Sequence, residues 1–278
     1  MKLLACLAFV GALLLAAAAS AQIHGQIYPA PTAALDPSGL PAGAVIDSVR
    51  TADGLTLKGI EIAPRDGKPT LLVLHGNGSN ATRSVEWFAP LIAEGYGMVA
   101  ADYREYSGNP GRASEAGLAA DADAFYARAR VVAGGGKLIV VGHSLGGGVA
   151  FGLATRQKLD ALVTIGTFTD LRAMVPAAAR WMIADRYDNA AAIATLDEPC
   201  YLVHGTADET IPFAHGEALR RAASAAHRAG ALFTIRDAHH SPDGADLAMI
   251  LRAVAAKTEN PGGVVKVQLP ETVRLTPF

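Results

Sequence analysis

The sequence contains a serine whose surroundings suit a nucleophile. Ser144 lies in Gly142-His143-Ser144-Leu145-Gly146, directly after an apolar run and directly before a glycine- and alanine-rich segment. A serine at a tight turn from strand to helix stands above the edge of the sheet, and the flanking glycines allow close backbone approach. The amide of Leu145 would then point at the oxygen of a bound carbonyl group. This pattern predicts acyl transfer with Ser144 as the nucleophile; the alternative is a glycine-rich turn that happens to contain a serine.

A serine hydroxyl needs a base to accept its proton, and the base needs an acid to fix its tautomer. The favoured acid is Asp208, in the loop after the apolar run 201–203, and Asp170 is its rival. The base is expected after the last strand, where His239 and His240 are adjacent. We favour His240, because such a loop usually has a small or polar residue just before its histidine. Two neighbouring histidines without a third ligand nearby do not predict a metal site.

A second donor to the developing oxyanion is expected from the segment His75-Gly76-Asn77-Gly78, which follows an apolar run. We assign the backbone amide of Asn77 to this role together with the amide of Leu145, and Gly78 is the neighbour that could share it. Hydrolysis by such a set of groups needs neither a metal ion nor an organic cofactor, so we expect none.

These residues fall at the ends of short apolar runs that alternate with segments of helical spacing. Parallel strands that are buried on both faces have this pattern, and chemistry collects at the carboxyl ends of such strands. The sequence therefore predicts an α/β fold with a mostly parallel central sheet and helices on both faces. The expected strands are residues 45–49, 55–62, 70–74, 97–101, 137–142, 161–165, 201–203 and 231–235; the expected helices are 114–132, the segment after Ser144, 213–228 and 243–256.

The first 21 residues have the pattern of a secretory signal peptide. Lys2 precedes an apolar run from Leu3 to Ala18, and Ala19-Ser20-Ala21 fits a small-x-small cleavage site. We expect cleavage after Ala21, a secreted or periplasmic protein, and no stable membrane span afterwards; a retained single anchor is the alternative. The expected organisation is a signal peptide (1–21), an extended lead-in (22–44), one α/β domain (45–260) and a C-terminal tail (261–278) in which residues 264–269 could add an edge strand.

The charge balance gives no indication of a nucleic acid or an anionic membrane as partner. Residues 1–21 contain one Lys and no acidic residue, so the remaining chain has 23 Lys and Arg against 26 Asp and Glu. Cys200 would be the remaining cysteine, which excludes an intramolecular disulfide, and its apolar surroundings predict a core residue. The sequence assigns no oligomeric state.

Four longer segments resemble a known family. From about residue 45 to 257 the chain resembles the α/β-hydrolase superfamily, with the chain order Ser, Asp, His. The resemblance is greatest to small serine hydrolases such as serine aminopeptidases, dienelactone hydrolases and depalmitoylating thioesterases. It rests on HGNGSN (75–80), DYREYSGNPGRASEAGLAADADA (102–124), GHSLGGGVA (142–150) and HGTADETIP (204–212).

The sequence also departs from the usual pattern of that group. Glu105 and Ser107 replace glycines, which is expected to alter the shape of the pocket rim. The stretch between strands at 166–199 is short, so the resemblance implies a minimal lid or none. The apolar side chains in that stretch are candidates for lining an acyl pocket or for packing as a buried helix face; they are Phe168, Met174, Trp181 and Met182.

The predicted function is a serine hydrolase that cleaves ester or thioester bonds of small or medium acyl substrates through an acyl-enzyme. The expected partner is thus a small-molecule acyl substrate. One alternative is a peptidase acting on short peptides, in which Glu105 or Glu209 binds the substrate amine. Another is a non-catalytic binding protein that has the same fold, because fold alone does not guarantee function.

Overall fold

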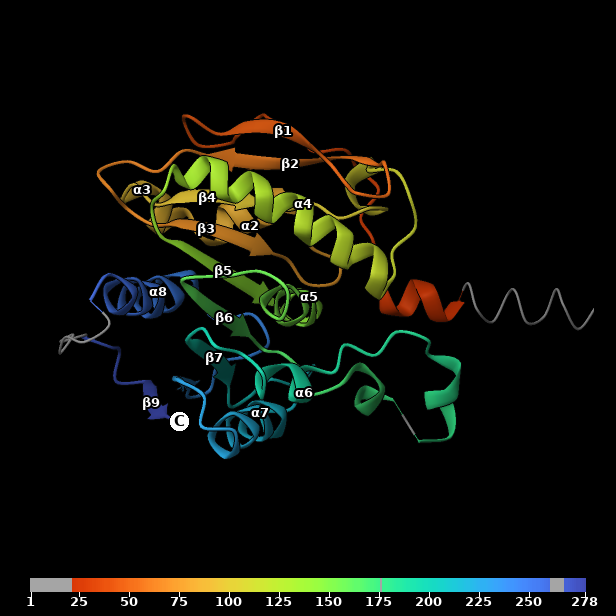
Figure 1. The fold of residues 1–278 in the computed structure, drawn as a ribbon, viewed down its shortest axis with the longest axis vertical. Coiled ribbons are helices and arrows are strands. Elements are labelled where there is room, and N and C mark those ends of the chain that lie inside the picture. The colour runs from red at the N-terminus through yellow and green to blue at the C-terminus, as the bar shows by residue number, and fades with distance from the viewer. Residues whose placement is uncertain (1–21, 176, 261–267) are drawn as a thin grey trace, which may run out of the picture.

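The computed structural model describes residues 22–175, 177–260 and 268–278. Within these residues, nine strands form one sheet in the order β1-β2-β4-β3-β5-β6-β7-β8-β9 (Figure 1). The pairings from β4 to β8 are parallel, whereas β1–β2, β2–β4 and β8–β9 are antiparallel. The strands are β1 (Val45–Arg50), β2 (Thr56–Ile62), β3 (Thr70–Leu74), β4 (Gly97–Ala100), β5 (Leu138–His143), β6 (Ala161–Ile165), β7 (Cys200–Gly205), β8 (Gly230–Ile235) and β9 (Val273–Pro277).

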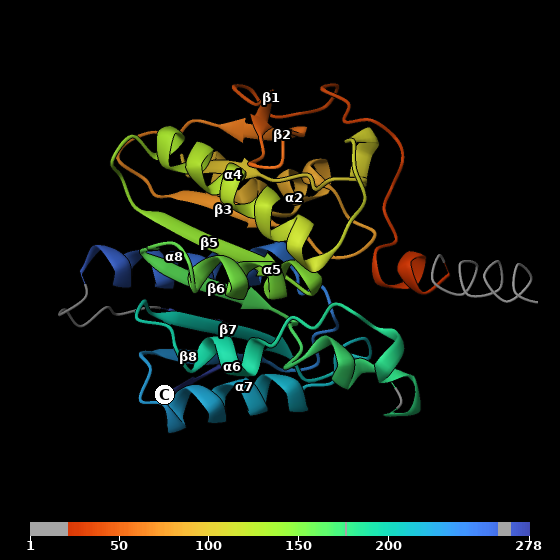
Figure 2. The same ribbon diagram turned by 45° about the vertical axis from the view of Figure 1, so that its right-hand side comes forward.

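Helices cover both faces of the sheet (Figure 2). The helices α4 (Glu115–Ala133), α5 (Leu145–Ala154), α6 (Asn189–Ile193) and α7 (Ala214–Ala225) pack on one face. The opposite face carries α2 (Ala81–Trp87), α3 (Ala89–Ala93) and α8 (Gly244–Glu259). Short 3₁₀ segments complete the connections: η1 (Tyr106–Gly108), η2 (Leu171–Met174) and η3 (Ala177–Met182).

The strand β3 shows why the central strands are continuously apolar. Its alternate residues Leu72 and Leu74 pack into the cluster under α4 and α5, whereas Leu71 and Val73 pack into the cluster under α2 and α8. Because side chains alternate across a strand, a sheet covered on both faces needs apolar residues at every position. The predicted α/β class is therefore confirmed, with each expected strand found within a few residues of its expected bounds.

Some elements differ from expectation. The sequence patterns did not predict the short helices α2, α3 and α6, each of five to seven residues. The expected edge strand at 264–269 lies mostly outside the described residues, and the strand that extends the sheet is β9 instead. The predicted signal peptide and its cleavage site also lie outside the described residues. None of the described helices is long and apolar enough to cross a membrane.

The expected extended lead-in contains a helical segment at residues 22–27. The next residue, Tyr28, is buried at 2% exposure. Two carbonyl groups then accept backbone hydrogen bonds from the main domain: Pro29 from Gly78 and Pro31 from Ser107. The Pro-, Ala- and Gly-rich sequence of this lead-in has no regular periodicity. Its ordered conformation therefore comes from tertiary contacts, which local sequence patterns do not encode.

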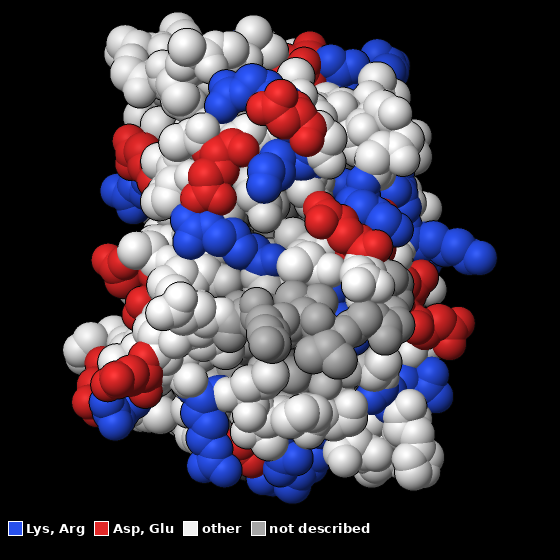
Figure 3. Space-filling model, turned by 90° about the vertical axis from the view of Figure 1, so that its left-hand side faces the viewer, with Lys and Arg blue, Asp and Glu red and all other residues white. Residues whose placement is uncertain are grey.

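The two ends of the parallel strands have different surroundings. The carboxyl ends of β5 and β6 point toward the side where residues 22–27, η2 and η3 lie (Figure 1). On the opposite side, basic and acidic residues are interspersed, with no large area of one sign on the face shown in Figure 3. Since chemistry collects at the carboxyl ends of parallel strands, the first of these sides is where a site is expected.

Candidate active site

Ser144 occupies a strained turn between β5 and α5. Its backbone has φ 54° and ψ −118°, a conformation that costs a non-glycine residue on the order of 1–3 kcal/mol. The turn is held by two backbone bonds: the Ser144 amide donates to the Ile165 carbonyl at 2.9 Å, and the Ser144 carbonyl accepts from Gly147 at 3.0 Å. A Cβ at Gly146 would overlap the carbonyl oxygen of Leu74, so the helix can approach β3 because glycine stands there.

His240 and Asp208 form a hydrogen-bonded pair beside this turn. The Nδ1 atom of His240 lies 2.9 Å from Oδ2 of Asp208, whose side chain is fully buried. The other carboxylate oxygen accepts the backbone amides of Thr210 at 3.0 Å and Ile211 at 2.8 Å. Because an ionised carboxylate can only accept, Nδ1 of His240 carries the proton and Nε2 is free to accept one.

The rival residues lie elsewhere. His239 points outward and pairs with Glu209 at 2.9 Å; the two side chains are 70% and 68% exposed, and this carboxylate raises the pKa of His239. Asp170 pairs with Arg186 at 2.9 Å. The described residues contain no group of three or more His, Cys, Asp or Glu that could hold a metal ion. The structure thus brings only one of the two histidines to the buried acid.

Three residues that the sequence reasoning did not assign hold the His240 loop. Nε2 of His143 donates to the carbonyl oxygen of His240 at 3.1 Å, and the two rings are 4.8 Å apart. The edge of the Trp87 ring packs on His143, and its Nε1 donates to the Pro242 carbonyl at 2.9 Å. Gly166 has φ 53°, and a Cβ there would come within 3.1 Å of the His240 ring. No sequence signal marks Trp87, because its role depends on the unpredicted helix α2.

Burial decides the charge state of His143. Loss of hydration lowers the pKa of His143 to about 4, and the nearby His240 acts in the same direction. The ring is therefore neutral near pH 7 and carries its proton on Nε2, since a carbonyl oxygen can only accept. This fixed donor orients the backbone of His240 without adding a charge beside its ring.

The expected oxyanion donors lie at the same place. Leu145 is the first residue of α5, where amides have no acceptor within the helix and the helix dipole favours a negative charge. Asn77 follows β3 and lines the same cavity as Ser144. The alternative donor, Gly78, gives its amide to the Pro29 carbonyl at 3.1 Å. The assignment of Asn77 and Leu145 as oxyanion donors stays a prediction.

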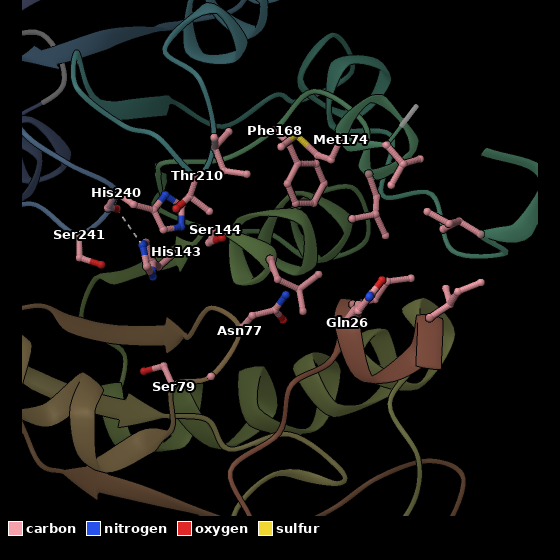
Figure 4. Close-up of a pocket in the computed structure, with 18 of the residues that line it drawn as sticks. Gln26, Asn77, Ser79, His143, Ser144, Phe168, Met174, Thr210, His240 and Ser241 are labelled. Atoms are coloured by element: carbon pink, nitrogen blue, oxygen red, sulfur yellow. Dashed lines mark hydrogen bonds between the residues drawn. The ribbon is translucent and has the colours of Figure 1, made fainter. Parts of the chain in front are cut away.

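Ser144 and His240 open into a cavity of about 700 Å³, which Asn77 and Leu145 also line. Figure 4 shows that the cavity extends to both sides of Ser144. One side carries the polar residues Ser79 and Ser241. Arg83 also lines the cavity. The other side carries Phe168, Met174 and Gln26 (Figure 4). Further apolar side chains of the lining are Ile23, Ile27, Leu171, Val175, Met182 and Ile183.

The apolar candidates divide between cavity and solvent. Phe168, Met174 and Met182 line the cavity, as expected for side chains of an acyl pocket. Trp181 does not: it is 82% exposed. The segment is a short 3₁₀ helix rather than an amphipathic α-helix, so its consecutive side chains do not share one buried face.

The chain is similar to known proteins to different extents. The model of a family described as serine aminopeptidase, S33, matches residues 65–187. An uncharacterized protein of Mycobacterium tuberculosis is 34% identical over 205 residues, which cover 70% of this chain and 72% of that protein. The lysophosphatidylserine lipase ABHD12 of Bos taurus is 33% identical over 130 residues, covering 44% of this chain and 33% of that protein.

Among solved structures, an esterase of Pyrococcus furiosus superposes with a TM-score of 0.63 and covers 84% of this chain and 95% of its own. At 18% identity, this likeness shows the fold alone. The sequence relatives and the family match indicate, in addition, that this chain shares ancestry with such proteins. The chain therefore belongs to the α/β-hydrolase superfamily.

Proposed function

We propose that this hydrolase is a serine carboxylic-ester hydrolase that cleaves ester or thioester bonds of small or medium acyl substrates. The observation that carries the proposal is that Ser144 and His240 line the same cavity, and that His240 is paired there with the buried Asp208. An acyl chain fits the apolar side, and an alcohol or thiol leaving group fits the side with Ser79 and Ser241. With residues 1–21 as a signal peptide, the activity would be secreted or periplasmic.

In the proposed reaction, Oγ of Ser144 attacks the carbonyl carbon and its proton passes to Nε2 of His240. The amides of Leu145 and Asn77 bind the oxygen as it becomes negative; such a donor is typically worth about 10²–10³ in turnover. The bond to the leaving group then breaks, and that group takes the proton from His240. Water attacks the acyl-enzyme by the same route in reverse, which releases the carboxylic acid and restores the Ser144 hydroxyl.

The charge of the cavity favours esters over peptides with a free amino end. The described part of the chain contributes Arg83 to the lining but no Asp or Glu. Glu105 and Glu209, which could have bound a substrate ammonium group, pair with His24 and His239 instead. A cation would therefore find no carboxylate there. Hydrolysis of aminoacyl-naphthylamides at rates comparable to esters would favour the peptidase alternative.

The decisive test compares the protein with Ser144→Ala on p-nitrophenyl esters with acyl chains of two to sixteen carbons. We expect kcat to fall by a factor of about 10³ or more, because the nucleophile is removed while binding remains. Labelling by a fluorophosphonate probe should be lost in parallel. Equal labelling of the folded variant, checked by its thermal unfolding, would refute the role of Ser144. A folded parent protein that hydrolyses no ester would leave the non-catalytic alternative.

A further inference from the structure

The N-terminal segment supplies part of the cavity wall. Ile23, Gln26 and Ile27 line the cavity although they lie far before Ser144 in the chain and outside the matched residues 65–187. Figure 4 shows the helical segment with Gln26 on the side of Ser144 that also carries Phe168 and Met174. Ile27 in addition packs against the main core cluster. Deleting these side chains from the wall would open the apolar side toward solvent.

Two side-chain anchors fix this segment to the domain. At its end, the Tyr28 hydroxyl donates to Oδ2 of Asp185 at 2.6 Å and lies 3.1 Å from the Tyr187 hydroxyl. Near its start, Nε2 of His24 lies 2.8 Å from Oε2 of Glu105. Because Asp185 and Tyr187 come from the stretch after η3, the first anchor also joins the two segments that face each other across the apolar side.

Glu105, which anchors His24, has a strained backbone conformation. It has φ 74°, in the left-handed region that favours glycine. The same carboxylate also accepts the amide of Ala113 at 2.7 Å. A strained non-glycine residue persists where the surrounding contacts hold it, and here the side-chain contacts include the N-terminal segment.

We propose that residues 23–28 act as an acyl-specificity strap, in which Ile23 and Ile27 set the longest acyl chain that the site accepts. The substrates would be esters or thioesters of medium-length, unbranched carboxylic acids. This inference rests on the proposed function, because its first two experiments measure ester hydrolysis. The residue after the strap is also tied to the proposed site, since the Pro29 carbonyl accepts the amide of Gly78, which follows Asn77.

The first experiment changes the volume of the strap. In Ile27→Phe, the ratio of kcat/KM for p-nitrophenyl decanoate to that for the acetate should fall about tenfold, because a pocket discriminates by factors of this size for each added carbon group. Leu275→Phe, a similar change at a 46% exposed position on β9, is the matched control and should keep the parental ratio. An unchanged ratio in folded Ile27→Phe would overturn the proposal.

The second experiment releases an anchor. His24→Ala removes the contact with Glu105 but leaves the Glu105–Ala113 bond, so the chain-length optimum should shift toward longer esters. His227→Ala, an exposed histidine after α7, is its control and should leave the optimum in place. An optimum that does not move in His24→Ala would contradict the anchoring role.

A binding measurement separates this inference from the catalytic proposal. The chain has two tryptophans: Trp87 lines the cavity and Trp181 lies on η3 beside Met182, so tryptophan fluorescence can report on binding. Titration of Ser144→Ala with fatty acids of six to sixteen carbons should show a length limit that Ile27→Phe shortens. If it does, but no ester is hydrolysed by the parent protein, the strap stands and the proposed function fails. If esters are hydrolysed through Ser144 but Ile27→Phe changes neither the length limit for fatty acids nor the ratio of decanoate to acetate hydrolysis, the proposed strap is refuted and the proposed function is not.

Discussion

Two histidine–carboxylate pairs join the loop after β8, which carries the histidines, to the loop after β7, which carries the carboxylates, and burial distinguishes them. His240 and Asp208 meet where the carboxylate is fully enclosed and also bound by two amides. His239 and Glu209 meet at a similar distance in solvent. An exposed ion pair contributes little because water screens it, whereas an enclosed carboxylate holds one tautomer of its histidine.

We therefore expect the two histidines to respond differently to substitution. His240→Ala should lower kcat for p-nitrophenyl butyrate by about 10³-fold or more, because it removes the histidine that lines the cavity with Ser144 and is hydrogen-bonded to a buried carboxylate. His239→Ala, alone or together with Glu209→Gln, should change kcat by less than about threefold. A large loss in the His239 variant with normal activity in the His240 variant would reverse our assignment of the base.

The pKa of His143, which burial lowers to about 4, predicts a pH dependence of stability. Above about pH 6.5, the ordinary value for histidine, neither the folded nor the unfolded chain is protonated here. Between pH 6.5 and 4, the unfolded chain binds a proton that the folded chain does not. As the pH is lowered from 6.5 to 4, the free energy of unfolding should thus decrease, and this group accounts for about 3 kcal/mol of the decrease. His143→Gln should flatten the curve of Tm against pH relative to the parent; parallel curves would exclude this cause.

At the scale of elements, helix ends carry local signals that the sequence shows directly. Ser144 starts α5 without a side-chain cap, and the strain of that turn is retained at a site of proposed chemistry. The helix α4 begins in the ordinary way: the Ser114 hydroxyl accepts the amide of Gly117 at 3.1 Å, with Glu115 in the first turn. Helix α4 is therefore the better place to test local stabilisation without touching the site.

Removing this cap should weaken the fold by a small, defined amount. Ser114→Ala is expected to lower the free energy of unfolding by about 1 kcal/mol, and Tm by about 2–4 °C for a domain of this size. Ser114→Asp keeps a side-chain acceptor and a favourable charge near the helix dipole, so it should retain parental stability. If the Asp and Ala variants lose equal stability, the hydroxyl contributes through something other than capping.

At the scale of the whole molecule, one buried arginine joins three separate parts of the chain. Arg104, after β4, contacts Asp53 in the turn between β1 and β2 at 2.8 Å. It also contacts Asp121 in α4 at 2.8 Å, where the two side chains are 8% and 0% exposed. The link fastens the antiparallel edge of the sheet to the helix that covers it.

Loss of the buried partner should leave Arg104 with the half-exposed Asp53 as its remaining partner of the two. Asp121→Ala is expected to destabilise the fold by about 3–5 kcal/mol, because the enclosed guanidinium loses its buried carboxylate and keeps the half-exposed Asp53. Arg156→Ala breaks a surface pair with Asp123 of 3.2 Å and should cost about 1 kcal/mol or less. Denaturant unfolding of both variants measures the difference. Similar losses in the two would mean that burial does not set the strength of the Arg104 link.

The sequence by itself determined the strands of the sheet, the longer helices and the candidate site residues. Strand β3 had to be apolar at every position because both of its faces are covered, so its pattern was legible without a structure. The Ser114 cap and the glycines around Ser144 are likewise local requirements of backbone geometry. Short helices such as α2 were not predicted, because their few residues are stabilised by packing rather than by periodicity.

Only the tertiary structure decided which histidine meets the acid and what closes the cavity. His239 and His240 are adjacent and chemically identical, so their roles depend on which way the loop turns, and that is set by contacts with His143 and Trp87 from distant elements. The strap at residues 23–28 shows the same limit. Its sequence has no strong local preference, and its position follows from long-range anchors to Glu105 and Asp185, which no pattern of neighbouring residues encodes.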